Sequence, residues 1–381
     1  MDDIYILGVG MHAFGRFAHK SYQEIGAFAA LAALNDAGLN WNQMQMAYLA
    51  RMFLPATSGA RILRQLGSTT IPICDVEAAC ASGGVALRQA ALAIRSGEID
   101  LALVIGVEKM PPGFMDPSAI YEPWQIEMGL CAGPAYWAMR AREHMHAYGT
   151  TEKHIAQVAV KNHRNSVYNP LAMYRRAYSL EEILASRMVC DPIRLLEICS
   201  PNEGAAAIVL GSRRAADRSG RKPVALLACE HRIAAYSADF RGPVHSLSLN
   251  LDHQTPTQSA AAAAYARTGL GPSDIDCFEV QDTDAFCEIE AYEELGLCPP
   301  GEGGALVDQG VTEINGAMPV NMSGGLISKG EPVGASHLGQ VVELVAQLRG
   351  EAGRRQVEGA RVGLAHVLGA GGNCVVSIVR R

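Results

Sequence analysis

The sequence predicts an α/β fold made of two similar halves, and two observations lead to this prediction. First, apolar stretches of strand length alternate with alanine-rich stretches of helical length, as in sheets covered by helices. Second, a pattern of paired alanines, Gly-Leu, a short loop and a strand occurs at residues 29–49 and again at 260–280. Each half also holds a Ser-Gly-Gly motif, at 82–84 and 323–325. Motifs repeated in the same order indicate an internal duplication, with a mixed, mostly parallel sheet in each half.

Composition excludes several classes of protein. The chain has 381 residues, is 49% hydrophobic and carries a net charge of −7, so it is large enough for two cores and too apolar to be disordered. It has no basic stripe with interleaved aromatic residues, which argues against nucleic-acid binding. No apolar run approaches the roughly 18 residues of a membrane span, and the acidic N-terminus does not resemble a signal peptide. We therefore expect a cytoplasmic protein.

The ten cysteines are scattered and form no Cys-x-x-Cys pair. Cys277, Cys287 and Cys298 are spaced too widely for a zinc knuckle, so we expect no metal site. In a chain of this size without an export signal, most cysteines are expected to be buried, reduced thiols. A functional cysteine must therefore be identified from its own context.

The first half begins with a strand at residues 4–10 that runs into a glycine turn. An apolar run at 101–107, bounded by charged residues, is typical of a strand buried on both faces. Between them the sequence predicts, in chain order, a helix at 22–37, a strand at 46–50, a helix at 58–66, a strand at 71–78, and a helix that starts within the Ser-Gly-Gly turn and stops at 96–97.

Residues from about 110 to 200 interrupt this alternation with prolines, tryptophans and amphipathic helical pieces. We interpret them as a long excursion from the core that covers a site. The core resumes at 204–210, and a charged linker follows at 212–222. The predicted division is therefore an N-terminal half at 1–219 and a C-terminal half at 220–381.

Cys80 is the candidate nucleophile because it lies just before a predicted helix N-terminus. Unpaired backbone N–H groups and the positive end of the helix dipole there favour a thiolate over a thiol. The small residues that follow it, Ala-Ser-Gly-Gly, leave room for a substrate to approach the sulfur. In the duplication, Asn321 occupies the position that corresponds to Cys80.

At this point the sequence resembles the thiolase superfamily, and within it the sterol-carrier-protein type of thiolase. The resemblance covers nearly the whole chain, and its order and spacing are specific although each motif alone is weak. The motifs that carry it are Cys80-Ala-Ser-Gly-Gly, Gly106-Val-Glu-Lys-Met, Val160-Lys-Asn-His, Asp191-Pro-Ile-Arg-Leu-Leu, Asn202-Glu-Gly-Ala-Ala-Ala, Asn321-Met-Ser-Gly-Gly-Leu-Ile-Ser-Lys-Gly and Ala365-His-Val-Leu-Gly-Ala-Gly-Gly.

The resemblance implies a five-layered α-β-α-β-α fold and a homodimer, or a dimer of dimers. It implies acyl chemistry on coenzyme A (CoA) thioesters, with CoA as a co-substrate and no permanently bound cofactor. In such enzymes a cysteine thiolate, here Cys80, takes an acyl group from a 3-oxoacyl-CoA, and free CoA then removes it.

The acid–base residues depart from the family pattern. Ordinary thiolases carry Gly-His-Pro, but this chain reads Gly-Glu-Pro around Glu331. Thiolases of the sterol-carrier type also carry His-Asp-Cys-Phe, where this chain reads Gln-Asp-Thr-Asp from Gln281. A buried glutamate with a raised pKa can act as a base near neutrality. We therefore expect Glu331 to be the general base, with His366 as the alternative proton acceptor.

Other residues have supporting roles in this hypothesis. Gln281 cannot exchange protons, so it is expected to orient a group or lie on the oxyanion side, and Asn321 is expected to orient through its amide. The closing turn at 369–372, with Gly371 and Gly372, is expected to supply backbone N–H groups to the oxyanion hole of the acylation step, together with that of Cys80. Basic residues for the CoA phosphates are expected within the excursion, at Lys161, Arg164, Arg175 and Arg176.

Each of these residues also has a purely structural interpretation. Glu331 could bond its own loop, His366 could be a satisfied core histidine, the glycines could only form a turn, and the basic residues could be a solvated face.

Three functions are compatible with the sequence. The first is a thiolase for a bulky 3-oxoacyl-CoA. The Gln-Asp-Thr-Asp and Gly-Glu-Pro variants resemble thiolase subunits that work with a small zinc-ribbon/OB-fold partner, as in the cleavage of 2-benzoylsuccinyl-CoA to benzoyl-CoA and succinyl-CoA. The second is a CoA-independent C-acyltransferase or a retro-aldolase on the same fold. The third is a non-catalytic acyl-CoA or lipid-binding protein.

Overall fold

The computed structural model describes residues 4–381 except 114, 117, 119–122, 130–132, 221 and 235–253. In this part of the chain the strands of both halves form one nine-stranded sheet, in the order β3-β2-β4-β7-β1-β8-β11-β10-β9. The strands of the first half are β1 (Ile4–Gly15), β2 (Met46–Ala50), β3 (Ile73–Val76), β4 (Leu101–Lys109) and β7 (Glu203–Ser212). Those of the second half are β8 (Val224–Arg232), β9 (Cys277–Glu279), β10 (Val362–Gly369) and β11 (Asn373–Arg380). The halves join where β1 pairs with β8.

Strand direction follows the same scheme in both halves. In the first half, β2 is parallel to β3 and β4, and β7 lies antiparallel between β4 and β1. In the second half, β9 is parallel to β10, and β11 lies antiparallel between β10 and β8. Each half is therefore a mixed sheet in which most strands run in one direction, which confirms the predicted α/β class.

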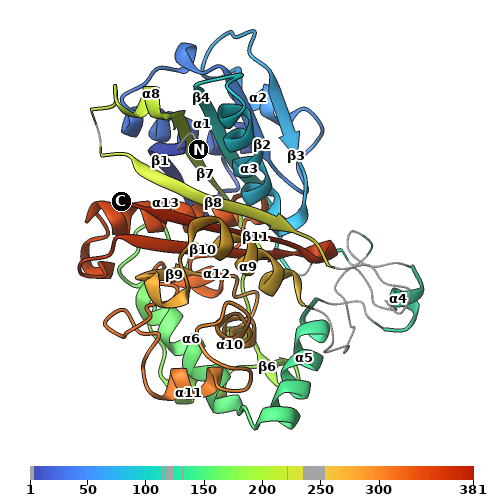
Figure 1. Ribbon diagram of the computed structural model, residues 1–381. Coiled ribbons are helices and arrows are strands. Elements are labelled where there is room, and N and C mark those ends of the chain that lie inside the picture. Colours follow the sequence, from blue (N-terminus) through green and yellow to red (C-terminus); the bar gives the residue numbers. More distant parts are fainter. Residues whose placement is uncertain are drawn as a thin grey trace.

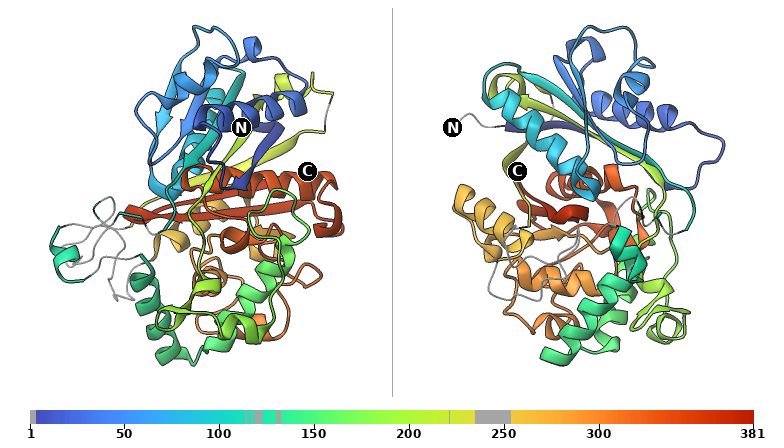
Figure 2. Two further views of the ribbon diagram at one scale, coloured as in Figure 1. Left: turned by 180° about the vertical axis from the view of Figure 1, so that it is seen from behind. Right: turned by 90° about the vertical axis from the view of Figure 1, so that its right-hand side faces the viewer.

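The helices divide the molecule into layers (Figures 1 and 2). The helices of the first half are α1 (Tyr22–Ala37), α2 (Ser58–Leu63), α3 (Ser82–Arg95) and α8 (Arg213–Ala216). Those of the second half are α9 (Pro256–Thr268), α10 (Ala285–Glu294), α11 (Gly303–Asp308), α12 (Gly325–Ser328) and α13 (Ser336–Arg349). Helices α3 and α13 contact each other between the two parts of the sheet, whereas α1 and α9 cover the outer faces.

Side-chain alternation on the strands explains this layering. On β4, Leu103 and Ile105 join a buried cluster with α1, whereas Val104 joins a central cluster with α3 and α13. On β11, Val375 faces the central cluster, and Val376 faces a third cluster with α9 and α10. Alternate residues of a strand point to opposite faces of its sheet. Two of the three clusters thus lie between the sheet and an outer helix layer, and the third surrounds the central helix layer. The layers are therefore arranged α-β-α-β-α.

The duplication is visible in how the helices begin and end. Helices α1 and α9 both start with a capping box, on Ser21 and Thr255, and both end at a glycine with positive φ, 67° at Gly38 and 70° at Gly269. Such caps satisfy the backbone groups that have no partner within a helix. None of the described helices has the length and apolar character needed to cross a membrane.

The counterpart of α3 differs from the sequence expectation. The short 3-10 turn η2 (Ala79–Ala81) precedes α3, and a similar turn, η6 (Val333–Ala335), precedes α13 and contacts η2. Gly334 therefore holds the position that corresponds to Cys80. The Ser-Gly-Gly motif of the second half leads only into the four-residue α12, so the expected match between Cys80 and Asn321 was wrong.

The excursion between β4 and β7 packs on the second half, where α6 contacts α10 and α11 (Figure 1). Its described elements are α4 (Pro123–Glu127), α5 (Gly133–Tyr148), α6 (Glu152–Ser166), α7 (Leu180–Leu184), β5 (Met188–Cys190) and β6 (Ile193–Arg194). Between α6 and α7, the N–H groups of Met173 and Tyr174 each donate to a carbonyl of residues 328–329, at 3.0 Å. The excursion thus holds the segment that leads to Glu331.

Candidate active site

Cys80 lies in η2, at the end of the sheet where the parallel strands β2, β3 and β4 all finish. The turn is held by Ser82, whose Oγ accepts from the N–H of Ala78 at 2.8 Å and donates to the carbonyl of Ala79 at 2.6 Å. Ala79 has a positive φ of 51°, which is rare for a residue with a side chain. Strained backbone of this kind is common at functional sites.

The Cys80 thiol lies within hydrogen-bonding distance of the carboxylate of Glu331. Loss of solvation raises the pKa of Cys80 well above its usual value, and the charge of Glu331 and its hydrogen bond to the thiol raise the pKa further. The backbone N–H of Ala370 acts in the opposite direction. The sequence predicted a thiolate favoured by the helix N-terminus, whereas in the structure burial and the neighbouring carboxylate of Glu331 both favour the thiol form of Cys80.

Glu331 is buried and has several hydrogen-bond donors around it. Its Oε2 accepts from the Cys199 thiol at 2.7 Å and its Oε1 from Gln281 Nε2 at 2.8 Å, in addition to the bond from Cys80. Burial raises the pKa of Glu331, while these three hydrogen bonds lower it. A carboxylate in such surroundings accepts a proton more readily than an exposed one.

The loop that carries Glu331 approaches its neighbours closely. A side chain at Gly330 would place its Cβ 1.8 Å from Asn202 Nδ2, and φ of Gly330 is 112°. Only glycine therefore fits at this position. The N–H of Glu331 donates to the carbonyl of Ser200 at 3.2 Å, so the side chain is aimed at Cys80 by fixed backbone.

Cys199 belongs to this group, although sequence reasoning missed it. It is 8% exposed, and its N–H donates to the carbonyl of Thr283 at 2.9 Å, which ties it to the segment that carries Gln281. It lies 119 residues from Cys80 along the sequence, and no motif spacing connects the two. Its position just before the predicted core strand at 204–210 is the only signal that could have found it.

Gln281 lies between Glu331 and the interior of the second half. Its Nε2 also donates to Thr283 Oγ1 at 3.1 Å. Its Oε1 is buried and has no hydrogen-bond partner among the described residues. The side chain can thus orient Glu331 with one end and meet a hydrogen-bond donor with the other.

His366 does not reach Glu331 or Cys80 through its ring nitrogens. Its Nδ1 accepts from the N–H of Gln281 at 3.4 Å, so Nε2 carries the proton and donates to Thr257 Oγ1 at 3.0 Å. Burial lowers the pKa of His366 to about 3. A neutral imidazole with both nitrogens bonded is a poor proton acceptor, which contradicts the expectation that His366 is the alternative base.

Asn321 is likewise occupied by structural contacts. It is fully buried with a φ of 55°, its Oδ1 accepts from the N–H of Val280 at 2.9 Å, and its Nδ2 donates to Glu288 Oε2 at 2.7 Å. The N-terminus of the following helix does not face the site either, because Asp282 accepts from Leu326 N at 2.6 Å. The amide of Asn321 therefore fixes the strand end that leads to Gln281, and the expected position of Asn321 beside the same centre as Cys80 is not found.

Comparisons with known proteins agree with this geometry. The family model described as the thiolase N-terminal domain matches residues 4–214, and that described as thiolase C-terminal domain-like matches 245–380. The chain belongs to the thiolase family. This confirms the resemblance predicted from the sequence, and it makes the protein an acyltransferase.

Several relatives are similar over nearly the whole chain. An acetyl-CoA acetyltransferase of Methanothermobacter thermautotrophicus is 38% identical over 393 residues, with 100% of each chain covered. Sterol carrier protein 2 of Bos taurus is 37% identical over 396 residues, 99% of this chain and 72% of its own length. The benzoylsuccinyl-CoA thiolase subunit BbsB of Thauera aromatica is 33% identical over 376 residues, 97% of this chain and 95% of its own.

A solved structure, that of the Ltp2-ChsH2(DUF35) aldolase, superposes with a TM-score of 0.87. It is 25% identical in sequence, and the match covers 99% of this thiolase and 97% of that chain.

The closing turn of this thiolase lies against Cys80. A Cβ at Gly369 would come within 2.9 Å of both Cys80 N and Ala81 N, and Gly371 and Gly372 have positive φ values of 75° and 66°. Glycine is therefore needed here for a close approach of two backbones. The turn also brings the backbone N–H of Ala370 to the Cys80 thiol.

One of the basic residues expected at the CoA phosphates is wrongly assigned. Lys161 is 3% exposed, and its ammonium bonds Glu288 and the carbonyl of Val320, so it stabilises the interior and cannot meet a phosphate. The other three lie on the surface of the excursion, where Arg164 pairs with Glu313, Arg175 donates to the carbonyl of Val167 and Arg176 pairs with Glu182.

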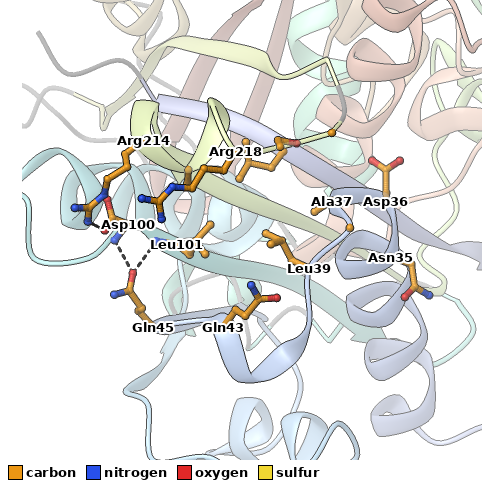
Figure 3. A pocket seen from close by; sticks show the side chains of 15 residues that line it. Asn35, Asp36, Ala37, Leu39, Gln43, Gln45, Asp100, Leu101, Arg214 and Arg218 are labelled. Carbon is orange, nitrogen blue, oxygen red and sulfur yellow. Dashed lines mark hydrogen bonds and ion pairs between the residues drawn. The ribbon is translucent and has the colours of Figure 1, made fainter.

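An open hollow on the first half lies away from this chemistry (Figure 3). It is lined by the end of α1 and the start of β4, at the opposite end of these elements from Cys80. Its polar groups bond one another: Gln45 Oε1 accepts from the N–H of Asp100 at 2.6 Å, and Arg214 pairs with Asp100. Among the described residues, no group of three or more His, Cys, Asp or Glu side chains is arranged to hold a metal ion.

Proposed function

We propose that this protein is a thiolase that cleaves, or in the reverse direction forms, a bulky 3-oxoacyl-CoA through an acyl thioester on Cys80. The observation that carries the proposal is the Cys80 thiol bonded to the buried carboxylate of Glu331. Glu331 takes the thiol proton as the sulfur attacks the 3-oxo carbonyl, so that it becomes neutral while negative charge develops on the substrate. The N–H groups of Cys80 and of the closing turn stabilise the oxyanion.

In the proposed cleavage, the S–C bond forms at C3 and the C2–C3 bond breaks. The electron pair remains on C2 and is protonated, which releases the shortened acyl-CoA. Free CoA, as co-substrate, then takes the acyl group from Cys80. Arg164, Arg175 and Arg176 are proposed to meet the CoA phosphates, because they lie on the exposed surface of the excursion that contacts the Glu331 loop.

The proposed substrate class is an aromatic 3-oxoacyl-CoA such as 2-benzoylsuccinyl-CoA. Support comes from the 33% identity to the benzoylsuccinyl-CoA thiolase subunit BbsB.

We further propose that the chain works as a homodimer or dimer of dimers together with a small zinc-ribbon/OB-fold subunit. The superposition on a chain of the Ltp2-ChsH2(DUF35) aldolase supports such a partner. Expression of the protein with candidate small subunits, followed by purification through a tag on one of them, would test this. Recovery of the thiolase chain alone, with full activity, would contradict it.

A retro-aldolase is the second candidate, because that same structural relative is called an aldolase. Glu331 could remove a hydroxyl proton in such a reaction, but a retro-aldol step needs no acyl-enzyme and leaves Cys80 without a role. The two candidates therefore differ in whether Cys80 becomes acylated.

The decisive experiment weighs the intact protein after incubation with a panel of 3-oxoacyl-CoAs that includes 2-benzoylsuccinyl-CoA. The thiolase proposal expects an added mass equal to the acyl group, lost in Cys80→Ser. Glu331→Gln should slow acylation by about 10²-fold or more, the lower range for a positioned general base. Substrate cleavage without any adduct would favour the aldolase, and unimpaired acylation in Glu331→Gln would remove Glu331 as the base.

A further inference from the structure

Two thiols, those of Cys80 and Cys199, lie at the carboxylate of Glu331, and the proposed mechanism uses only that of Cys80. The Cys199 thiol donates to Oε2 at 2.7 Å, Gln281 donates to Oε1 at 2.8 Å, and the Cys80 thiol also bonds the carboxylate. Cys199 is buried and held by backbone, since its N–H bonds the carbonyl of Thr283. The two sulfurs are thus linked through a single proton acceptor.

The reaction needs a proton donor that this arrangement can supply. When the C2–C3 bond of the substrate breaks, the electron pair left on C2 must take a proton. Among the residues assembled at the site, the Gln281 amide cannot give one, and the polar atoms of Asn321 and His366 are bonded to Glu288, Val280, Thr257 and Gln281 itself. Cys199 and Glu331 are the groups that remain.

Protonation of Glu331 changes what Cys199 can do. As long as Glu331 is ionised, the Cys199 S–H is held by the carboxylate. After Glu331 has taken the proton of Cys80, the carboxyl group itself becomes a donor, and the Cys199 sulfur can accept from it. The proton of the Cys199 thiol can then pass to another acceptor, and a proton from Glu331 can replace it.

We propose that Cys199 is a second acid–base residue that transfers its proton to C2 of the leaving acyl-CoA. The S–H bond of Cys199 breaks as the C–H bond forms with the electron pair from the C2–C3 bond. The Cys199 sulfur then recovers a proton from neutral Glu331, so that the net transfer carries the proton of Cys80 to carbon and restores the Glu331 carboxylate. In the reverse direction Cys199 removes the α-proton. This inference rests on the proposed thiolase function.

Two half-reactions distinguish proton transfer by Cys199 from a role in which Cys199 only positions Glu331 by a hydrogen bond. Transfer of benzoyl from benzoyl-CoA to Cys80 breaks no C–C bond and involves no carbanion, and benzoyl-CoA has no α-hydrogen. Exchange of the α-hydrogens of acetyl-CoA or succinyl-CoA with D₂O requires the carbanion step alone. The first is measured by intact-protein mass and the second by the mass of the recovered CoA ester.

The variants are Cys199→Ala and Cys199→Ser, with Cys277→Ala as the control. Cys277 is a fully buried thiol of β9 that bonds only a backbone carbonyl, that of Val362, at 3.9 Å. We expect Cys199→Ala to lose α-hydrogen exchange and substrate cleavage by about 10²-fold or more. Loss of the Cys199 hydrogen bond also raises the pKa of Glu331, so benzoyl transfer is compared on the high-pH plateau of each protein, where Glu331 is ionised, and should fall much less than exchange. Cys199→Ser keeps a hydrogen-bond donor for Glu331 but is a far weaker acid, so exchange should stay low.

Each other result overturns the inference. Normal exchange in either Cys199 variant removes Cys199 from the proton path. If Cys199→Ala loses exchange and benzoyl transfer equally, and Cys199→Ser restores both, then Cys199 only positions Glu331. Absence of any acyl adduct on the native protein, with every acyl-CoA tried, defeats the proposed function itself and this inference with it. Acylation of the native protein therefore distinguishes failure of the proposed function from failure of the Cys199 proposal alone.

Discussion

At the scale of single residues, the site has a carboxylate, that of Glu331, where ordinary thiolases carry the histidine of Gly-His-Pro, and neutral donors surround it. A carboxylate beside a thiol opposes ionisation of the thiol, and the pKa of Cys80 is raised accordingly. In the proposed mechanism the proton moves to Glu331 during attack, so that two adjacent anions never coexist. The amide of Gln281, together with the thiols of Cys199 and Cys80, stabilises the ionised form of Glu331 by hydrogen bonds and so lowers its basicity.

The first prediction concerns Gln281→Leu. Loss of a hydrogen bond to a charged group costs about 1.5–3 kcal/mol, so the variant should raise the pKa of Glu331 further. Acylation of Cys80 needs ionised Glu331, so the rate falls as pH decreases through this pKa. The midpoint in the variant should therefore move to higher pH. The rate of adduct formation, measured by quenching and mass spectrometry across pH, reports the shift.

Gln347→Leu is the matched control, because Gln347 is a buried glutamine that bonds Glu343 and Arg355, away from the site. Its acylation midpoint should equal that of the native protein. The same midpoint in Gln281→Leu and the native protein would show that Gln281 does not tune Glu331.

At the scale of elements, the site depends on the close packing of two equivalent turns. Gly106 of β4 lies against the turn η6, where an added Cβ would come within 2.3 Å of the Gly334 carbonyl oxygen and 2.8 Å of Ala335 Cα. The turn η6 contacts η2, which carries Cys80. A displacement of β4 from η6 therefore reaches the nucleophile through backbone alone, since no long side chain lies between them to adjust.

The second prediction follows from this contact. Gly106→Ala should destabilise the protein by about 1–3 kcal/mol, the range for overpacked cores, and should slow acylation because η2 shifts relative to Glu331. Urea denaturation and adduct formation measure the two effects. Gly133→Ala, at the start of α5, has nothing within 4 Å of the added Cβ and should be neutral in both assays. A Gly106→Ala protein with native stability and rate would contradict this account of the packing.

At the scale of the whole molecule, the sequence predicted the architecture well because the alternation of strands and helices is local and is repeated. The helix at 22–37 and the strand at 46–50 are found with the predicted bounds. The duplicated motif Ser-Gly-Gly misled the alignment of the halves, because three small residues can form a tight turn before a long helix or before the short α12. The position of α13 was the better guide to the true counterpart of α3.

The site was only partly predictable. Cys80 could be found because it occupies a recognisable motif position. Glu331 could be found because it stands where another motif has a histidine. Cys199 could not, since the excursion separates it from Cys80 and only the folded chain returns it to Glu331. Asn321, His366 and Lys161 have the chemistry expected of site residues, but burial commits their polar atoms to other partners. Which polar side chains face a substrate is a property of packing, which residue types do not reveal.

The last prediction concerns a buried histidine that joins the central helix layer to the sheet. His337 of α13 donates from Nδ1 to Gln340 Oε1 at 3.1 Å, and its Nε2 accepts from Ser377 Oγ of β11 at 2.9 Å. Burial lowers the pKa of His337 to about 4. Because the folded pKa lies below the unfolded value of about 6.5, the unfolded chain binds a proton between these two values that the folded protein does not. The contribution of His337 to stability is therefore complete above pH 6.5 and is lost as pH falls toward 4.

Glu108, Glu197 and Asp284, whose pKa values burial raises to about 7, act in the opposite direction, so the effect must be read as a difference between variants. The free energy of unfolding of the native protein minus that of His337→Gln should decrease by about 1.4 kcal/mol per pH unit between pH 6 and 5. Leu344→Ala on the same helix removes a fully buried side chain that does not titrate, and its cost of about 2–5 kcal/mol should not change with pH. Urea unfolding at a series of pH values compares all three proteins. A difference for His337→Gln as flat as that for Leu344→Ala would show that folding does not lower the pKa of His337, and it would contradict this prediction.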